Sequence, residues 1–249
     1  MLLENKVAVI YGGGAISGAA ATAFSREGAR IFLAGRNLTK LDQVASAVRA
    51  QGGNVDTAVV DAYDEQAVNR YVDTVVAQEG YIDISFNLIS TGDVQQPLME
   101  ITVDDFLQPI INTMRAHFIT GRAAARHMIK RRSGVILAFG GGGSQTVSGL
   151  GGFKISLDAL EGLRRQWAME LGEHGIRVVT LKTGGIPETL GSDFPNREEM
   201  VAGFAQATLL KRAATLEDVG NVAAFVASDH ARTITSTEVN ISCGALVDG

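Results

Sequence analysis

Short apolar runs alternate with amphipathic stretches along the whole chain. A short apolar run is typical of a strand buried on both faces, and apolar residues three and four positions apart are typical of a helix. The runs predict strands at 6–11, 30–34, 55–60, 82–87, 134–139, 176–181 and 237–241. The stretches between them predict helices at 16–27, 38–51, 64–79, 102–130, 154–173 and 216–228. This alternation implies a doubly wound, mostly parallel α/β sheet of seven strands, with helices on both faces.

Glycines gather in the turn that follows the first predicted strand. The turn carries Gly12, Gly13, Gly14 and Gly18. Glycines let the backbone approach a pyrophosphate, and a helix that begins near residue 16 points its unpaired N–H groups at those phosphates. A glycine-rich turn can also exist without a ligand, but this one lies between a strand and a helix that leads to a second strand. The pattern therefore favours a dinucleotide site in a Rossmann fold.

The length and composition fit one α/β domain over residues 1–249, of which 46% are hydrophobic and 20% charged. With a net charge of −5 and no basic stripe, nucleic acid is not expected as a partner. No apolar run approaches the roughly 20 residues of a membrane span, and the chain enters its first strand without room for a signal peptide. One cysteine, Cys243, excludes an internal disulfide and fits a cytoplasmic location.

With these elements in register, the chain resembles the short-chain dehydrogenase/reductase family along nearly its whole length. The segment Tyr11–Gly18 corresponds to the family's Thr-Gly-x-x-x-Gly-x-Gly loop, with Gly12 and Gly18 kept. Ile16 stands where the family has its middle glycine, and Gly14 could supply the close backbone approach in a shifted loop. The resemblance implies the Rossmann fold and a nicotinamide dinucleotide as cofactor.

Three further segments resemble cofactor-binding parts of the family. Asn87 matches the first residue of the Asn-Asn-Ala-Gly sequence after the fourth strand. The pair Asp61 and Ala62 resembles the pair that contacts adenine, although Asp61 could instead cap the helix that begins near Asp64. The turn at 183–189 resembles the Pro-Gly-x-x-x-Thr turn that contacts the nicotinamide end. The cofactor residues implied in that turn are Gly184, Ile186 and Thr189.

The end of the second strand bears on which cofactor binds. A carboxylate at this position would accept hydrogen bonds from the adenosine ribose and would repel a 2′-phosphate. This chain has Gly35 there, followed by Arg36, whose guanidinium offers several donors suited to a phosphate. An exposed arginine at a strand end is the alternative. The residues therefore favour NADP(H) over NAD(H).

The family's usual proton donor is missing. Members use a tyrosine four residues before the active-site lysine, whose charge lowers the pKa of the phenol. Lys154 matches the lysine, but Leu150 stands at the tyrosine position and Gly141 at the serine position. All four tyrosines precede residue 82, so no shift of register supplies one.

Lys154, Asn112 and Ser144 remain as candidate catalytic residues. Lys154 is expected chiefly as a ligand of the cofactor ribose, with a surface lysine as the alternative. Asn112 matches the family's active-site asparagine, or is a helix-interior residue that holds a water. Ser144 could orient a carbonyl or relay a proton through water, or be a polar loop residue. His117 lies off the helical face of Asn112, and no histidine has a partner at metal-ligand spacing, so no metal site is expected.

The remaining expectations concern substrate and assembly. Residues 187–212 lie where the family carries its substrate lid, and their apolar side chains fit a hydrophobic carbonyl compound or, equally, a helix docked on the body. The resemblance implies a homotetramer that dimerises through the helices at 102–130 and 154–173. Two hypotheses follow. One is an NADP(H)-dependent oxidoreductase that acts on a carbonyl or hydroxyl compound with an atypical proton donor. The other is a nucleotide-binding or assembly subunit that kept the fold and lost the chemistry.

Overall fold

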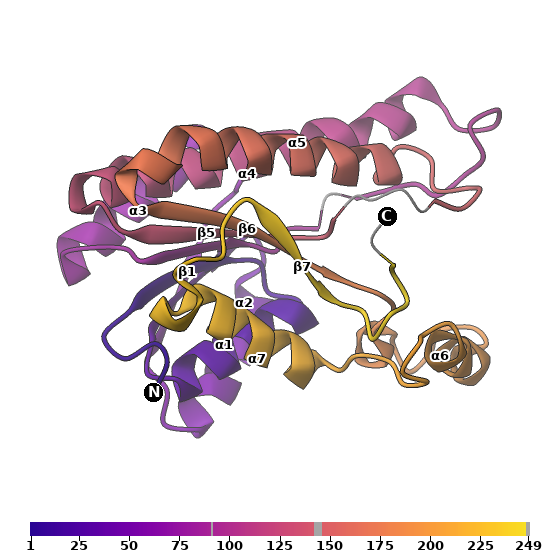
Figure 1. Ribbon diagram of the computed structural model, residues 1–249, viewed down its shortest axis with the longest axis horizontal. Coiled ribbons are helices and arrows are strands. Elements are labelled where there is room, and N and C mark those ends of the chain that lie inside the picture. Colours follow the sequence, from indigo (N-terminus) through magenta and orange to yellow (C-terminus); the bar gives the residue numbers. More distant parts are fainter. Residues whose placement is uncertain (91, 142–145, 248–249) are drawn as a thin grey trace.

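The computed structural model describes residues 1–90, 92–141 and 146–247. At its centre is a seven-stranded sheet in the order β3-β2-β1-β4-β5-β6-β7 (Figure 1). The strands are β1 (Val7–Tyr11), β2 (Arg30–Gly35), β3 (Val55–Val59), β4 (Ile84–Asn87), β5 (Gly134–Phe139), β6 (Ile176–Thr183) and β7 (Thr237–Ile241). Every pairing between neighbouring strands is parallel. The predicted doubly wound α/β fold is confirmed.

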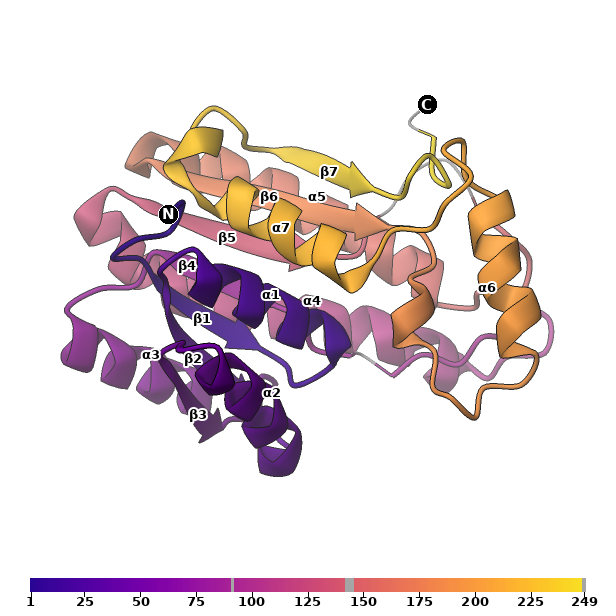
Figure 2. The ribbon, with the colours of Figure 1, turned by 90° about the horizontal axis from the view of Figure 1, so that it is seen from below.

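Helices cover both faces of the sheet. The helices are α1 (Ala15–Arg26), α2 (Leu38–Ala50), α3 (Glu65–Glu79), α4 (Val103–Arg131), α5 (Phe153–Leu171), α6 (Arg197–Gln206) and α7 (Leu216–Ala227). Figure 1 shows α3, α4 and α5 over one face, and α1, α2 and α7 over the other. Helix α6 belongs to neither layer and lies beyond the carboxyl ends of the strands (Figure 2).

The sheet separates two apolar layers because alternate side chains of a strand point to opposite faces. On β1, Ala8 and Ile10 pack in the layer under α1, α2 and α7, whereas Val7, Val9 and Tyr11 pack in the layer under α3, α4 and α5. Strand β1 pairs with β2 on one side and with β4 on the other, so the strand order reverses there. In such a sheet, the ligand crevice lies outside the carboxyl ends of the strands at this reversal.

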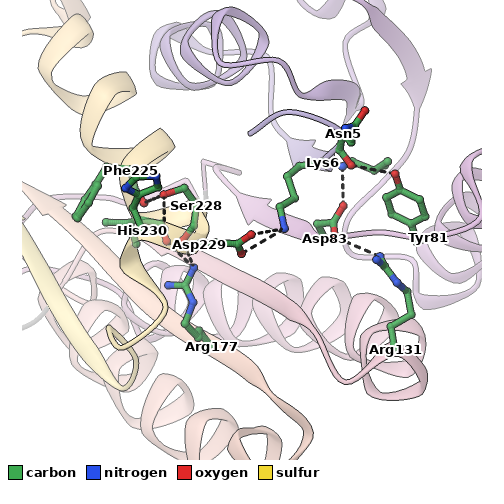
Figure 3. Close-up of polar contacts among 12 residues, drawn as sticks. Asn5, Lys6, Tyr81, Asp83, Arg131, Arg177, Phe225, Ser228, Asp229 and His230 are labelled. Atoms are coloured by element: carbon green, nitrogen blue, oxygen red, sulfur yellow. Dashed lines mark hydrogen bonds and ion pairs between the residues drawn. The ribbon is translucent and has the colours of Figure 1, made fainter. Parts of the chain in front are cut away.

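Polar contacts tie the amino ends of the strands together, at the edge opposite this crevice (Figure 3). Asp83, just before β4, accepts a hydrogen bond from the backbone N–H of Val7 at 2.8 Å and another from Arg131 at 3.2 Å. Lys6, just before β1, forms an ion pair with Asp229 at 3.1 Å. These contacts join segments distant in the sequence and leave the carboxyl edge of the sheet for a ligand.

The predicted elements agree with the observed ones to within two residues at each end. Strand β6 continues past its predicted end at residue 181 and includes Lys182 and Thr183. The segment at 187–212, expected as a lid, contains α6. Across the described part of the chain, none of the helices combines the length and the apolar character that a membrane crossing requires.

Candidate functional site

The turn between β1 and α1 requires glycine at its first position. Gly12 has a φ of +125°, which L side chains rarely adopt, and a Cβ there would lie 2.7 Å from the carbonyl oxygen of Leu88. Gly14 precedes α1 as its N-cap, and a Cβ there would meet nothing within 4 Å. No side chain caps the helix. The turn therefore leaves room for an anion at the first N–H groups of α1.

Ile16 and Gly18, in the first turns of α1, have packing roles in the structure. Ile16 is half-buried and packs against the apolar layer on this side of the sheet. A Cβ at Gly18 would lie 3.6 Å from a methyl carbon of Val44 on α2, which is ordinary contact. Of the glycine and isoleucine positions considered for phosphate contact, Gly14 is the exposed one.

Arg36 and Asp61 lie beside Tyr63, beyond the ends of β2 and β3. Arg36 is exposed, and its guanidinium carbon lies 5.6 Å from the centroid of the Tyr63 ring. Asp61 accepts a hydrogen bond from the backbone N–H of Tyr63 at 3.0 Å. The cap of α3 is Asp64 rather than Asp61, because the Asp64 carboxylate accepts from N–H groups of the first turn. Ala62 is buried.

Asn87 ends β4 and is buried against α4. Its Nδ2 donates to the hydroxyl of Thr120 at 3.0 Å, and its Oδ1 accepts from the backbone N–H of Ile89 at 3.0 Å. One end of the amide therefore holds the connection that leaves β4, and the other end binds α4. These contacts within the protein account for an asparagine at this position.

A cleft of about 780 Å³ lies at the carboxyl edge of the sheet, where β5, β6, α4 and α5 meet. Its lining includes Ile89 and Ser90 after β4, Thr113 and His117 on α4, Phe139, Gly140 and Gly141 at β5, Phe153, Lys154 and Leu157 on α5, and Thr183 and Gly184 at the end of β6. A cleft of this size, with apolar walls and a few polar groups, suits a small molecule.

Helix α5 turns an apolar face to this cleft. Phe153, Leu157 and Leu160 line the cleft at helical spacing. Lys154 also lines it, but its ammonium lies 2.6 Å from both carboxylate oxygens of Asp158, one turn further along. The Lys154 charge is therefore half of an ion pair, and a ligand would compete with Asp158 for it.

Helix α5 and the residues before it offer no phenol to the cleft. Leu150 lies four residues before Lys154, and Phe153 lies directly before Lys154. Leu150 and Phe153 both line the cleft, and neither side chain can donate a proton. Ser144, the candidate hydroxyl nearest in sequence to the missing serine, lies outside the described residues.

The four tyrosines lie elsewhere. Tyr11 and Tyr71 pack in the layer under α3 and α4, where burial raises the pKa of each phenol above its ordinary value. Tyr63 lies beside Arg36. Tyr81, at the amino ends of the strands, donates to the backbone carbonyl of Asn5 at 2.9 Å (Figure 3).

On α4, the cleft is lined by Thr113 and His117, and Asn112 is not among the lining residues. Thr113 and His117 are four residues apart and so lie on one face of the helix. Burial lowers the pKa of His117 to about 4, which keeps the imidazole neutral near pH 7. His117 lies five residues after Asn112 and so falls off the helical face of that residue. It lies four residues after Thr113 and shares the helical face of Thr113, which is the signal in the sequence that points to it.

Helix α6 packs on the turn that follows β6. Gly184 lines the cleft, and a Cβ at Gly185 would lie 2.5 Å from the ring of Phe204 on α6. Ile186 is buried, and the Thr189 hydroxyl donates to the Ile186 carbonyl at 2.8 Å. The expected nicotinamide turn thus has α6 packed directly on it.

Sequence analysis also missed a group of ionisable side chains beside the cleft. Lys182 and Glu238 form an ion pair at 2.7 Å, as do Arg164 and Glu161. The available signal was a lysine directly after the predicted strand at 176–181. Among the described residues, no cluster of three His, Cys, Asp or Glu side chains could hold a metal ion.

Comparisons with known proteins agree with this architecture. A family model described as enoyl-(acyl carrier protein) reductase matches residues 13–245. Secoisolariciresinol dehydrogenase from Forsythia intermedia is 34% identical over 258 residues, which cover 97% of this chain and 89% of that protein. A short-chain dehydrogenase/reductase structure from Serratia marcescens is 26% identical with a TM-score of 0.85, covering 98% of this chain and 99% of that one.

A second solved structure shares the fold. It is a short-chain type dehydrogenase/reductase from Mycobacterium ulcerans, with a TM-score of 0.89 and 24% identity over 98% of this chain and 91% of that one. The family match, the relative's identity and the site at the carboxyl edge of the sheet all agree. This chain belongs to the short-chain dehydrogenase/reductase family of oxidoreductases.

Proposed function

We propose that this protein is an NADP(H)-dependent oxidoreductase that interconverts a carbonyl and a hydroxyl compound, using an atypical proton donor. The observation that carries the proposal is that three candidate binding features lie at the same edge of the sheet. The glycine turn of β1, Arg36 after β2 and the 780 Å³ cleft beside β5 and β6 all lie at the carboxyl ends of the strands. A dinucleotide that spans the strand reversal can reach from Arg36 to the cleft.

The residues present fit such a cofactor. The turn at Gly12 and Gly14 leaves space at the uncapped start of α1 for a pyrophosphate. Arg36 would bind the 2′-phosphate of NADP(H), and Asp61 with Ala62 would border the adenine. Toward the other end, the cofactor would meet the remaining expected contacts, Asn87, Lys154, Gly184, Ile186 and Thr189. When bound, the cofactor supplies or accepts a hydride at its nicotinamide ring.

The cleft supports a substrate with an apolar body. Phe139, Phe153 and Leu157 form apolar walls next to the place expected for the nicotinamide. Helix α6 and its flanking residues, 187–212, would act as the lid, because Phe204 already packs on the turn at Gly185. The chemical class that fits is a small hydrophobic ketone, aldehyde or alcohol.

We further propose a homotetramer in the cytoplasm. The solvent-facing sides of α4 and α5 carry exposed apolar side chains, which a partner subunit would cover. They are Leu107, Ile111 and Phe118 on α4, and Ile155 and Met169 on α5.

One observation favours a second function. Gly141 and Leu150 leave the family's serine and tyrosine positions without hydroxyls, as expected for a subunit that binds the nucleotide but does not react. The deciding experiment is to titrate NADPH and NADH, then to assay a panel of ketones and aldehydes with saturating NADPH. NADPH binding with turnover above the uncatalysed rate supports the oxidoreductase. Tight NADPH binding without turnover on any compound supports the second function, and absence of nucleotide binding contradicts both.

A further inference from the structure

Four largely buried ionisable side chains meet beside the cleft, on the face of the sheet that α5 covers. Lys182 of β6 pairs with Glu238 of β7, and Arg164 of α5 pairs with Glu161 one turn earlier, each at 2.7 Å. Lys182 is 5% exposed and Glu161 3%. Lys182, Arg164 and Glu238 all line the cleft. Burying charges costs free energy that an apolar cluster would not, so the arrangement suggests a function.

Lys182 crosses the end of β5 because position 141 is glycine. A Cβ on Gly141 would lie 2.8 Å from the Cβ and 3.2 Å from the Cδ of Lys182. A side chain at position 141 would therefore collide with the lysine stem. Lys182 lies against Gly141, at the end of the cleft where the nicotinamide is expected. Gly184, which also lines the cleft, follows Lys182 by two residues.

Other polar groups also line the cleft, among them the hydroxyls of Thr113, Ser156 and Thr183. His117 is neutral near pH 7, because burial lowers its pKa to about 4. Lys154 pairs with Asp158 as Lys182 pairs with Glu238, so the Lys154→Met variant described below compares the two lysines. Leu150 and Phe153 carry no exchangeable proton. Lys182 differs from Lys154 in its place, because its stem packs against the backbone at Gly141.

We propose that Lys182 is the proton donor of this cleft and that Glu238 positions its ammonium toward the substrate oxygen. This inference rests on the oxidoreductase function proposed above. Carbonyl reduction needs a hydride at carbon, which the cofactor supplies, and a proton at oxygen. The Nζ–H bond of Lys182 breaks as the O–H bond of the alcohol forms, and the nitrogen keeps the electron pair as a neutral amine. In alcohol oxidation, the same amine accepts the proton.

The two carboxyls of this cluster differ in how readily they ionise. Burial raises the pKa of the Glu161 carboxyl, and the neighbouring Glu238 carboxylate adds to this effect. Burial opposes ionisation of Glu238, but Lys182 and Glu161 outweigh it and lower the Glu238 pKa. After proton donation, the neutral Lys182 amine takes a proton from the solvent of the cleft that it lines.

The test separates charge from proton transfer at position 182. Lys182→Arg keeps a cation for Glu238 but cannot release a proton near pH 7. Lys182→Met keeps the unbranched stem but loses both the positive charge and the transferable proton. We expect each variant to lower kcat by about 10²- to 10⁴-fold, with the dissociation constant of NADPH changed less than about threefold. Lys130→Met, an exposed lysine at the end of α4, is the matched control.

A binding measurement avoids dependence on turnover. Cyclohexanecarboxamide is an unreactive carbonyl compound whose ring suits the apolar walls, and its affinity for the protein can be measured by ligand-observed NMR. We expect Lys182→Met to weaken this affinity about tenfold, because a hydrogen bond from a charged donor is lost. Lys182→Arg should retain most of it, since arginine still donates.

Folding is controlled by a double variant. Lys182→Met leaves the Glu238 carboxylate without its close cation, so Lys182→Met with Glu238→Gln removes both charges together. Thermal unfolding and NADPH binding report whether each variant is folded. The double variant should remain folded and show the same loss of kcat.

The outcomes distinguish this inference from the proposed function. A wild type that turns over, with Lys182→Arg equally active, overturns the Lys182 assignment alone. Loss of turnover in Lys154→Met but not in Lys182→Met also overturns it, in favour of Lys154. A wild type that binds NADPH but reduces nothing overturns the oxidoreductase function and proton transfer by Lys182 together. In that case, unchanged carboxamide affinity in Lys182→Met also overturns the contact between Lys182 and a carbonyl oxygen.

Discussion

Arg36 lies over the ring of Tyr63, with its guanidinium carbon 5.6 Å from the ring centroid. The two residues follow different strands, β2 and β3, and meet at the carboxyl edge of the sheet. The ring restricts where the guanidinium can lie, and this contact does not use the N–H donors of the guanidinium. Arg36 is thus held in place with its donors available for a phosphate.

Arg36→Ala should weaken NADPH binding and leave NADH binding nearly unchanged. The expected loss for NADPH is about 1.5–3 kcal/mol, because one charge-assisted hydrogen-bonded pair is removed. Fluorescence titration of both nucleotides against wild type and variant measures it. Equal preference for the two nucleotides in both proteins would contradict the assignment of the 2′-phosphate to Arg36.

Tyr63→Ala should also weaken NADPH binding, by about 0.5–1 kcal/mol, since an exposed cation–π contact is worth about that much. Tyr63→Phe is the matched control because it keeps the ring, and its NADPH affinity should equal that of the wild type. A loss of the same size for NADH in Tyr63→Ala would show that the ring contacts the shared part of the nucleotide rather than holding Arg36.

Asp158→Asn should increase the affinity for NADPH by about twofold to fivefold. It releases the Lys154 ammonium from a partly exposed ion pair, and such pairs are worth about 0–1 kcal/mol. The same substitution in a Lys154→Met background is the control and should change nothing. An increase in both backgrounds would mean that Asp158 repels the phosphates directly. No change in either would show that Lys154 does not contact the cofactor.

The free energy of unfolding should fall as the pH is lowered from about 6.5 to about 4, with a contribution from His117. The folded-state pKa is below that of the unfolded chain, so the unfolded chain binds the extra proton in this range. The full shift corresponds to about 3 kcal/mol at most, and the partial exposure of His117 reduces this. Urea unfolding at several pH values should show a shallower decline in His117→Gln than in wild type. His230→Gln, at an exposed position, is the control and should show the same decline as wild type. If His117→Gln also shows the wild-type decline, a buried neutral imidazole at position 117 is excluded.

Light scattering at micromolar concentration should report a tetramer. Met169 on α5 is 80% exposed in the isolated chain, and Phe118 on α4 stacks on Trp167 of α5 at 5.7 Å between ring centroids. Met169→Lys should lower the oligomeric state, because a charge would be buried between subunits. Leu38→Lys, on the opposite layer, should leave it unchanged. A monomeric wild type would contradict the assembly.

The order and type of the elements could be predicted from the sequence because their signals are local. An apolar run such as residues 7–10, a turn residue and a helical period are each read within a few positions. The need for glycine at Gly12 is equally local, since its φ of +125° follows from a strand that turns at once into a helix. The glycine-rich turn directly after the first strand predicted that a ligand would bind at the carboxyl ends of the strands.

Tertiary structure decided which side chains reach that edge. Side-chain direction depends on how a helix is rotated against the sheet, and this rotation is fixed by packing between distant segments rather than by spacing along the chain. It placed Thr113 and His117, not Asn112, at the cleft. The ion pair of Lys182 and Glu238 likewise forms only because parallel strands β6 and β7, joined through α6 and α7, come side by side. Parallel pairing brings together residues far apart in sequence, and a single sequence carries no local signal for it.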